Sequence, residues 1–388
     1  MWRDCLLGDV IELKRGYDLP DRLREPGDVP IISSSGVSGT HAVAKVRGPG
    51  VVTGRYGTLG EVFYVPGDFW PLNTALYVVD FKGNDPRFVS FWLKLQSLGS
   101  QNAAGAVPGV NRNHLHRLEV RVPDVETQRE IGSTLSTYDD LIENNTRRIA
   151  ILEEMARRIF EEWFVHFRAP GCEGLPLVES ELGPIPKGWK ALPLSEVAAV
   201  NPEQITPRNP PASINYIDIA SVSPGSIDAV VPMDFSDAPG RARRIVRHGD
   251  VIWSTVRPNR RSFALVAHPL PDTIASTGFA VLRARDVPWA YLYCATTTQG
   301  FTDYLTNHAT GSAYPAVKAD DFEKAVILVP PRSVLADFAK LAEPAFSLGQ
   351  TLRGQNRNLR AQRDLLLPKL ISGEIEVADA APMLEAAE

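Results

Sequence analysis

Arginine is the residue type whose spacing in this sequence first suggests chemistry. Seven arginines fall between residues 241 and 261, where Asp250 is the only acidic residue. A guanidinium group can bind phosphate, or the edge of a guanine base, through two parallel hydrogen bonds. The segment therefore favours contact with nucleic acid, although a solvated basic face would have the same composition. The seven are Arg241, Arg243, Arg244, Arg247, Arg257, Arg260 and Arg261.

Polar residues around two turns are the candidate DNA contacts. Residues 254–261 pack hydrogen-bond donors into a turn after a strand-like run, and residues 53–58 occupy the corresponding place in the first half of the chain. The candidates are Arg244, Ser254, Thr255, Arg257, Asn259, Arg260 and Arg261, with Arg55, Tyr56 and Thr58 in the first half. Weaker candidates, which could equally cap helices or complete loops, are Lys14, Arg15, Ser34, Asn111, Arg112, Ser312 and Tyr314.

Motifs for catalysis are absent or weak. The sequence has no Gly-x-x-x-x-Gly-Lys-Ser/Thr loop for nucleotide phosphates. Asn-Pro-Pro at 209–211 is close to an amino-methyltransferase motif, but Ala212 stands where an aromatic residue would stack the flipped base. Asp68 with Asp80 and Lys82 could form a nuclease-like group, but a turn is the better interpretation. The seven histidines lack metal-binding spacing, so we expect no catalytic residue and no metal site.

Composition describes an ordinary globular protein. The 388 residues are 44% hydrophobic and 22% charged, with a net charge of −5 that gives no overall sign of nucleic-acid binding. At roughly 100–200 residues per domain, two to four domains are expected. The three cysteines form no CxxC pair, and there is neither a long apolar run nor a signal-peptide core. A location in the reducing cytoplasm is therefore predicted.

The chain contains an internal repeat of long period. Trp2, Leu7, Asp9 and Val10 recur as Trp189, Leu194, Glu196 and Val197, and Val122-Pro123 recurs as Val329-Pro330. Each match alone is weak, but their common order indicates a tandem duplication. Both copies, residues 1–123 and 189–330, are rich in Gly, Pro and short β-branched runs that predict strands between turns. With helices expected at Phe88–Leu98 and Trp289–Thr306, each copy is predicted to be an α+β domain.

A long helix is predicted after each copy, at residues 124–168 and 331–372. Apolar residues there alternate at gaps of four and three, which is the seam of a coiled coil. Pro344 is expected to kink or restart the second helix. The first seam comprises Ile131, Leu135, Tyr138, Ile142, Ile149, Leu152, Ile159 and Trp163. The second comprises Phe338, Leu341, Ala345, Leu348, Leu352, Leu359 and Leu366.

The two helices are expected to bury one another as an antiparallel pair with pseudo-twofold symmetry, because neither apolar stripe could stay exposed. Asn145 lies on the seam and is interpreted as a residue that fixes the register. Residues 169–188, rich in Pro and Gly, are predicted to be an ordered linker, and residues 373–388 to be a flexible acidic tail.

Three local sequences carry a resemblance to a known family. Residues 159–168 (IFEEWFVHFR), 182–189 (LGPIPKGW) and 365–375 (LLLPKLISGEI) are similar to conserved segments of the DNA specificity subunits of type I restriction-modification systems. They correspond there to the end of the first helix, the start of the second target-recognition domain and the end of the second helix. The likeness covers nearly the whole chain.

The resemblance implies a subunit without catalytic activity. Such subunits bind an asymmetric, bipartite double-stranded DNA site and hold two adenine-methyltransferase subunits, which ATP-dependent restriction and translocase subunits join. AdoMet, ATP and Mg are then expected on the partner subunits. Two alternatives remain open: an orphan or anti-restriction DNA-binding protein without enzymatic partners, and a coiled-coil scaffold that does not bind DNA. The clustered arginines and the absence of aromatic sugar platforms argue against the scaffold.

Overall fold

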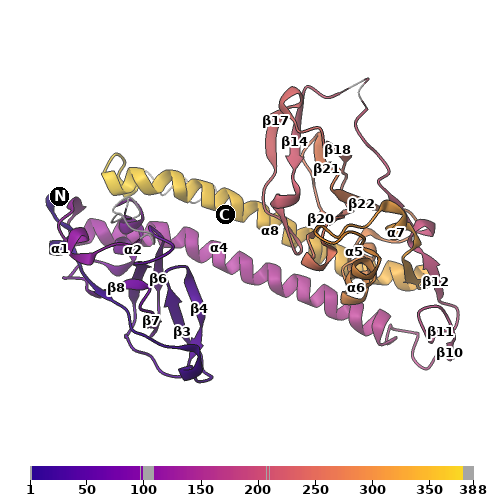
Figure 1. Cartoon of the computed structure of the whole chain (residues 1–388), viewed down its shortest axis with the longest axis horizontal. Coiled ribbons are helices and arrows are strands. Elements are labelled where there is room, and N and C mark those ends of the chain that lie inside the picture. Colours follow the sequence, from indigo (N-terminus) through magenta and orange to yellow (C-terminus); the bar gives the residue numbers. More distant parts are fainter. Residues whose placement is uncertain (1, 97, 99–108, 207, 209, 379–388) are drawn as a thin grey trace. The chain divides into compact units, whose positions relative to one another are not determined.

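Two compact units make up the chain. The computed structural model describes residues 2–96, 98, 109–206, 208 and 210–378 (Figure 1). The first unit comprises Met1–Thr146 and Gly354–Glu388, and the second comprises Arg147–Arg353. The long helices α4 (Val125–Phe160) and α8 (Arg332–Ser372) each contribute one segment to either unit. Each unit is therefore an α+β globule together with a pair of helical segments.

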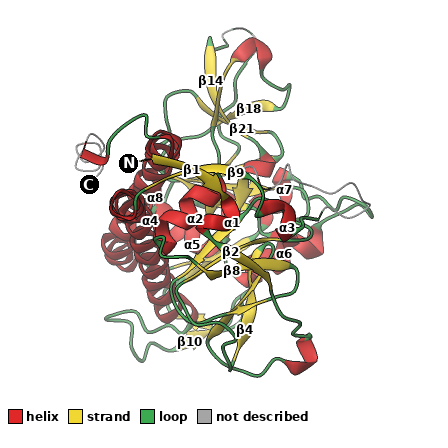
Figure 2. Ribbon diagram, turned by 90° about the vertical axis from the view of Figure 1, so that its left-hand side faces the viewer, coloured by secondary structure: helices red, strands yellow, loops and turns green. Residues whose placement is uncertain are grey.

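The first globule is built around a four-stranded antiparallel sheet in the order β2-β8-β5-β6. The first globule also contains a separate three-stranded sheet in the order β4-β3-β7. Strands β1 and β9 form an antiparallel pair and lie side by side (Figure 2). The strands are β1 (Trp2–Leu6), β2 (Glu12–Arg15), β3 (Val29–Ser33), β4 (Gly36–His41), β5 (Gly50–Gly54), β6 (Val62–Val65), β7 (Trp70–Pro71), β8 (Ala75–Asp80) and β9 (Glu119–Pro123). The helices are α1 (Leu7–Val10), α2 (Pro86–Lys94) and α3 (Arg112–Leu115).

The second globule has two four-stranded sheets, β13-β22-β19-β20 and β17-β14-β21-β18, and a β12-β23 pair. Their strands are β12 (Lys190–Pro193), β13 (Ala198–Val200), β14 (Ser213–Ile217), β17 (Val231–Asp234), β18 (Ala242–Ile245), β19 (Asp250–Ser254), β20 (Phe263–Val266), β21 (Thr273–Ser276), β22 (Phe279–Ala284) and β23 (Val326–Val329). Two small hairpins are β10 (Leu177–Val178) with β11 (Ile185–Pro186), and β15 (Val222–Ser223) with β16 (Ser226–Ile227). The helices are α5 (Trp289–Thr296), α6 (Gln299–His308) and α7 (Ala319–Lys324).

The two globules share one strand order, which confirms the tandem α+β domains predicted from the repeat. Sheet β2-β8-β5-β6 corresponds strand by strand to β13-β22-β19-β20. The pair β1-β9 corresponds to β12-β23, and both units contain one parallel pairing, β3 with β7 and β14 with β21. The second copy adds β18 beside β21, which accounts for part of its greater length.

The predicted helix Trp289–Thr306 is two helices. Helix α5 ends at Thr296, and α6 begins at Gln299. Thr298 is the reason for the break, because its Oγ1 accepts a hydrogen bond from the backbone N–H of Phe301 at 3.1 Å and so caps a new helix. Apolar periodicity alone does not reveal such a cap.

In the first unit, α4 and α8 pack antiparallel, as expected. Asp139 of α4 pairs with Arg363 of α8, and the later residue Asn145 of α4 pairs with the earlier residue Asn356 of α8. The two helices therefore run in opposite directions. The predicted seam residues here are all buried: Ile131, Leu135, Ile142, Leu359 and Leu366. They join the core of the first globule.

Buried asparagines complete this seam. Asn145 donates from Nδ2 to Oδ1 of Asn356 at 3.1 Å, and Asn356 donates to the carbonyl of Ile142 at 3.2 Å. A buried polar pair is satisfied in one alignment of the helices only. This pairing agrees with the expected role of Asn145 in fixing the register.

In the second unit the helices are again antiparallel, since Glu153 of α4 pairs with Arg353 of α8 and, further along α4, Phe160 packs against Phe338. Ile149 and Leu352 are buried and Leu152 is half-buried, but Leu341 and Leu348 are 50% and 40% exposed, so their assignment to the seam is wrong. Counting back from Leu352 in steps of three and four gives a better frame: Gly349, Ala342 and Phe338 are buried and Ala345 is half-buried, and Phe338 and Ala345 belong to the predicted seam as well. The sequence does not indicate this frame, because Gly349 and Ala342 are small and the neighbouring Leu348 and Leu341 fit a heptad pattern equally well.

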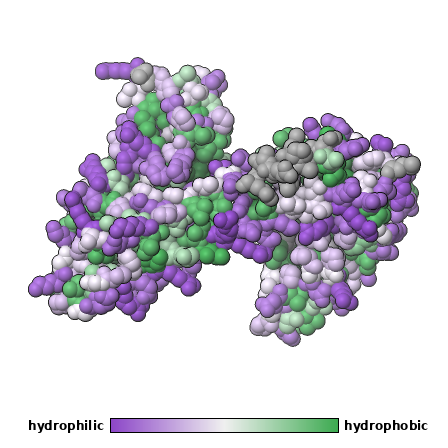
Figure 3. Space-filling model, turned by 180° about the vertical axis from the view of Figure 1, so that it is seen from behind, coloured by the Kyte–Doolittle hydropathy of each residue, from purple (hydrophilic) through white to green (hydrophobic). Residues whose placement is uncertain are grey.

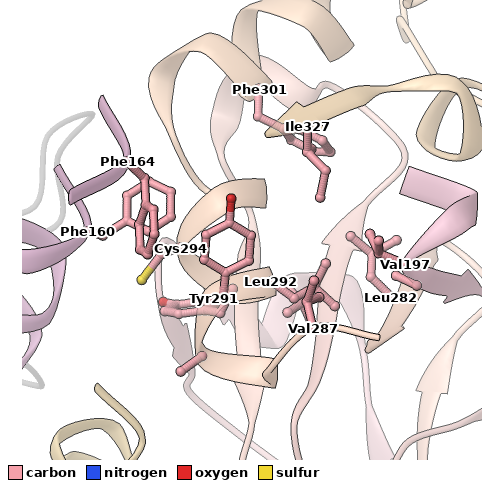
Figure 4. Close-up of a cluster of buried hydrophobic side chains, with 14 of the residues drawn as sticks. Phe160, Phe164, Val197, Leu282, Val287, Tyr291, Leu292, Cys294, Phe301 and Ile327 are labelled. Carbon is pink, nitrogen blue, oxygen red and sulfur yellow. The ribbon is translucent and has the colours of Figure 1, made fainter. Parts of the chain in front are cut away.

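Pro344 neither ends nor restarts α8, which is continuous from Arg332 to Ser372. The end of α4 passes into a π-helical turn at Glu161–Val165. There Phe160 and Phe164 face Tyr291 of α5, with ring centroids 5.6 and 4.9 Å apart (Figure 4). These contacts fix the end of α4 to the second globule, so the aromatic segment 159–168 has a packing role.

Candidate nucleic-acid interface

The loops at one end of the main sheet form the candidate interface of the first globule. Strand β2 ends where β8 begins, and β5 ends beside the same point, because neighbouring strands are antiparallel. The backbone N–H of Arg55, directly after β5, donates to the carbonyl of Thr74 at 2.9 Å. The N–H of Val110 donates to the carbonyl of Arg55 at 2.9 Å. Three segments distant in sequence therefore meet at Arg55.

Arg55 is held against an exposed aromatic ring. Its guanidinium carbon lies 4.4 Å from the ring centroid of Tyr56, whose side chain is 42% exposed. Its Nη1 donates to the carbonyl of Asn73 at 3.5 Å. Stacking on tyrosine restricts the guanidinium while leaving most of its N–H donors free for a ligand.

The other candidates of the first globule reach the same region. Ser34, in the turn between β3 and β4, lies next to Gly57, where an added Cβ would be 3.7 Å from its Oγ. Arg112 donates to the carbonyl of Leu13 at 3.5 Å, next to the exposed Lys14 and Arg15. Asn111 caps α3 by accepting from the N–H of Asn113 at 2.9 Å, which is the alternative role considered for it. Thr58 is exposed in the same loop.

The second globule repeats this loop arrangement after the equivalent strand, β19. The N–H of Thr255 donates to the carbonyl of Gly278 at 2.8 Å, and Val317 donates to the carbonyl of Thr255 at 2.9 Å. Val256 forms a β-bridge with Ala316, just as Tyr56 does with Gly109 in the first globule. The structure therefore brings the segments containing Arg257 and Tyr314 together.

Arg257 carries the second exposed arginine–tyrosine pair. Its guanidinium carbon lies 4.7 Å from the ring centroid of Tyr314, which is 70% exposed, and its Nη2 donates to the carbonyl of Ala313 at 3.0 Å. The backbone of Arg257 is left-handed, with φ of 52°, an uncommon conformation for a residue other than glycine. A hydrogen bond of 2.7 Å from its N–H to the carbonyl of Pro315 holds it there. Ser312 is exposed beside this pair.

The remaining residues of this loop divide by role. Asn259 and Arg260 are exposed. Arg261 turns instead toward α6, donating to Gln299 at 2.8 Å and to the carbonyl of Thr297 at 3.0 Å. Ser254 is 2% exposed and donates to the carbonyl of Val256 at 2.9 Å, so contrary to expectation its hydroxyl shapes the loop.

Thr255 has the same kind of role, because its Oγ1 donates to the carbonyl of Gly278 at 2.9 Å. Arg244 is half-buried in β18, its Nε has no hydrogen-bond partner among the described residues, and burial lowers the pKa of its guanidinium. We therefore regard Thr255, Arg261 and Arg244 as structural residues of the loop and sheet.

Acidic residues distant in sequence neutralise part of the arginine cluster. Arg241 pairs with Asp218 at 2.5 Å, and Arg247 pairs with Glu203 at 2.7 Å. Burial acts to raise the pKa of Glu203, but hydrogen bonds from Arg247 and Arg283 outweigh it, and the pKa is lowered. The sequence view of a segment opposed only by Asp250 is therefore wrong. The positive charge left for a ligand is concentrated at the loop after β19.

The weak motifs for catalysis lie only partly within the residues that the structure describes. No cluster of three or more histidine, cysteine, aspartate or glutamate side chains suits a metal ion among those residues. Asp80 accepts from the backbone N–H of Lys82 at 2.7 Å, as the turn interpretation expects. Asn209, of the Asn-Pro-Pro segment, lies outside the described residues. Within the same ranges, no helix has the length and apolar character needed to cross a membrane.

Sequence reasoning missed three residues near this interface. Tyr17, Lys45 and Trp70 come from separate segments of the first globule and lie together there. Lys45 is an isolated lysine in a stretch of small residues, without a motif around it. Only the β-bridge between Val46 and Phe69, which sets the chain beside Trp70, brings it to the cluster.

A fold of duplicated α+β domains, each with an exposed arginine-bearing loop and a segment of paired long helices, defines a class of two-domain recognition proteins. Comparisons show which known proteins the chain resembles. Residues 1–154 match the model of the type I restriction modification DNA specificity domain. The crystal structure of the S subunit of a type I restriction-modification system from M. genitalium has a TM-score of 0.67, at 15% identity and covering 96% of each chain.

Two curated proteins with similar sequences are also type I specificity subunits. The chain is 25% identical over 280 residues to the MjaIX type I specificity subunit of Methanocaldococcus jannaschii, covering 70% of this chain and 64% of that protein. It is 22% identical over 344 residues to the HindI specificity subunit of Haemophilus influenzae, covering 71% and 73%. The match to the first relative thus spans less than two thirds of its length. The chain is thus similar to type I restriction-modification DNA specificity subunits in sequence, and its fold is that of a solved S subunit.

Proposed function

We propose that this chain reads an asymmetric, bipartite double-stranded DNA site, with one half-site for each globule. One observation supports this most directly: beside the end of the equivalent central strand, each unit has an arginine stacked on an exposed tyrosine, Arg55 on Tyr56 and Arg257 on Tyr314. The loops after the two strands make the same backbone hydrogen bonds to neighbouring segments but have different side chains. They are therefore suited to equivalent docking on two different base sequences.

The proposed DNA contacts are the candidates other than Ser254, Thr255, Arg244 and Arg261, which serve the loop and sheet of the second globule. Arginine and lysine would position the globules on phosphates, and the stacked arginines would also read base edges. In the first globule the contacts are Lys14, Arg15, Ser34, Arg55, Tyr56, Thr58, Asn111 and Arg112, and in the second Arg257, Asn259, Arg260, Ser312 and Tyr314.

The chain is proposed to act without catalysis of its own, holding two adenine-methyltransferase subunits and, through the complex, restriction subunits that bind AdoMet, ATP and Mg. Hydrophobic residues reach the surface in several places (Figure 3). In the second unit, Met155 and Leu348 are 53% and 40% exposed. Both lie on the flank of the seam opposite the Glu153–Arg353 ion pair, as g positions do. Exposed apolar surface of this kind supports a protein partner.

Selection from a random-duplex library tests the proposal. We expect two short, different motifs separated by a constant gap. Binding of the full chain to duplex DNA should weaken steeply as salt increases. A single continuous motif, or binding that does not depend on sequence, would contradict the bipartite proposal. Co-purification with a methyltransferase subunit, weakened by Met155→Glu and Leu348→Glu but not by Arg332→Ala, tests the partner.

A further inference from the structure

Two lysines of the first globule converge on one aromatic ring. The Nζ of Lys45 lies 5.1 Å from the ring centroid of Tyr17, and that of Lys14 lies 5.8 Å from the same centroid. Lys45 is also 5.6 Å from the ring centroid of Trp70, which packs edge-on against Tyr17 at 6.4 Å. An ammonium group is attracted to the face of such rings. Two flexible side chains are thereby held in neighbouring positions.

The ring itself is fixed from behind. The hydroxyl groups of Tyr17 and the buried Tyr77 lie 3.0 Å apart, which anchors Tyr17 to the central strand β8. The hydrogen bond with Tyr77 lowers the pKa of Tyr17, and the charges of Lys14 and Lys45 act in the same direction. The three groups thus form one electrostatic unit on a rigid support.

Both ammonium groups lack a counterion. Among the described residues, no carboxylate pairs with Lys14 or Lys45, whereas the nearby Asp18 is engaged by Arg15 at 3.8 Å and by Asn73. Two like charges held at one ring repel each other unless an anion binds beside them. Asn73 also accepts from Arg55, so the cluster is continuous with the proposed interface.

The second globule has other residue types at two of the equivalent positions. Its strand β13 pairs Val200 with Leu282, in the place where β2 pairs Leu13 with Val78. By this register Lys14 corresponds to Asn201 and Tyr17 to Gln204. The contact of Lys14 with Tyr17 is therefore not repeated there.

We propose that Lys14 and Lys45, oriented by Tyr17, form a phosphate clamp with which the first globule grips the DNA backbone next to its half-site. This rests on the proposed DNA-binding function. The clamp contributes affinity without sequence information, because phosphates are the same along the duplex. It gives the first globule an electrostatic anchor in addition to the loop of Arg55.

The salt dependence of binding tests the clamp. The full chain and the variants Lys14→Gln, Lys45→Gln, Lys45→Arg and Lys369→Gln are titrated on the selected duplex and on a random duplex between 50 and 200 mM salt, roughly the range over which phosphate contacts are resolved. Each Gln variant of the clamp should lower the slope of log K against log salt by about 0.9, equally on both duplexes. Lys45→Arg should keep the slope, and Lys369→Gln, on α8, is the exposed control.

The possible outcomes distinguish failure of the phosphate clamp from failure of the proposed DNA binding. Steep salt dependence in the wild type with unchanged slopes in both clamp variants would overturn the clamp while leaving DNA binding intact. Loss of affinity on the selected duplex alone would also overturn it, because it would show base reading. A wild-type chain that does not bind duplex DNA would overturn both. Circular dichroism of each variant confirms that the fold is retained.

Discussion

Arg257 is constrained by its backbone hydrogen bond to Pro315, by its side-chain bond to Ala313 and by the ring of Tyr314. A constrained arginine loses little entropy when a ligand binds. We expect Arg257→Ala and Arg260→Ala to weaken DNA binding without loss of fold. A phosphate contact would reduce the salt slope by about 0.9 on every sequence, and a base contact would cost about 1–3 kcal/mol on the selected site alone.

Arg332→Ala is the matched control, since that arginine is exposed in the same unit and pairs with Asp286. If Arg257→Ala and Arg260→Ala both keep the fold and the wild-type affinity for DNA, the loop after β19 does not contact DNA and is only a basic surface.

Ser254 differs from these arginines because its hydroxyl is buried and satisfied within the protein. Ser254→Ala leaves the carbonyl of Val256 without this donor. We expect the free energy of unfolding to fall by about 1 kcal/mol, while the salt slope of DNA binding stays at the wild-type value. Denaturant unfolding and a salt titration measure the two quantities. A lower slope in the folded variant would return Ser254 to the list of DNA contacts.

At the scale of the elements, Leu348 and Leu352 form a matched pair on α8. Leu352 is 3% exposed within the seam, and Leu348 is 40% exposed beside it. Leu352→Ala should destabilise the protein by about 2–5 kcal/mol, because it removes buried methyl groups and leaves a cavity. Leu348→Ala should change stability by less than about 0.5 kcal/mol. If Leu348→Ala and Leu352→Ala lower the free energy of unfolding equally in chemical denaturation, Leu348 belongs to the seam.

This pair also shows how far sequence reasoning reaches. The long helices and their heptad rhythm were predictable, because periodicity is a property of spacing alone. The phase was not predictable around Gly349, where a small residue occupies the seam and a leucine stands beside it. Choosing between the two frames requires the partner helix.

The same limit applies to the candidate interface. The turn that holds Arg257 could be found from its arginines, and Arg55 from the repeat. The role of Arg261 depends on its hydrogen bond to Gln299, which lies far away in the sequence. The role of Ser254 depends on its burial, which the sequence does not show. The lysine clamp was invisible for the same reason: Lys45 reaches Tyr17 only through tertiary pairing.

At the scale of the whole molecule, the gap between half-sites is the measurable quantity. If α4 and α8 set that gap, removing seven residues from each helix should shorten it and leave both half-site sequences unchanged. Replacing residues 1–123 with the first globule of another family member should exchange one half-site only. Selection from a random-duplex library measures both effects. A gap that does not respond to helix length would exclude the helices as its determinant.

The core of the first unit includes Leu359, Leu366 and Leu370 from the far end of the chain. A growing polypeptide emerges from the ribosome in order, and N-terminal domains usually fold first. Here the helix face of Ile131 and Leu135 stays uncovered until the segment beginning at Gly354 has been made, whereas the second unit is one continuous stretch. The second unit therefore completes its core first during translation. A chain that terminates early exposes an apolar stripe to chaperones and proteases, so only full-length protein is expected to accumulate.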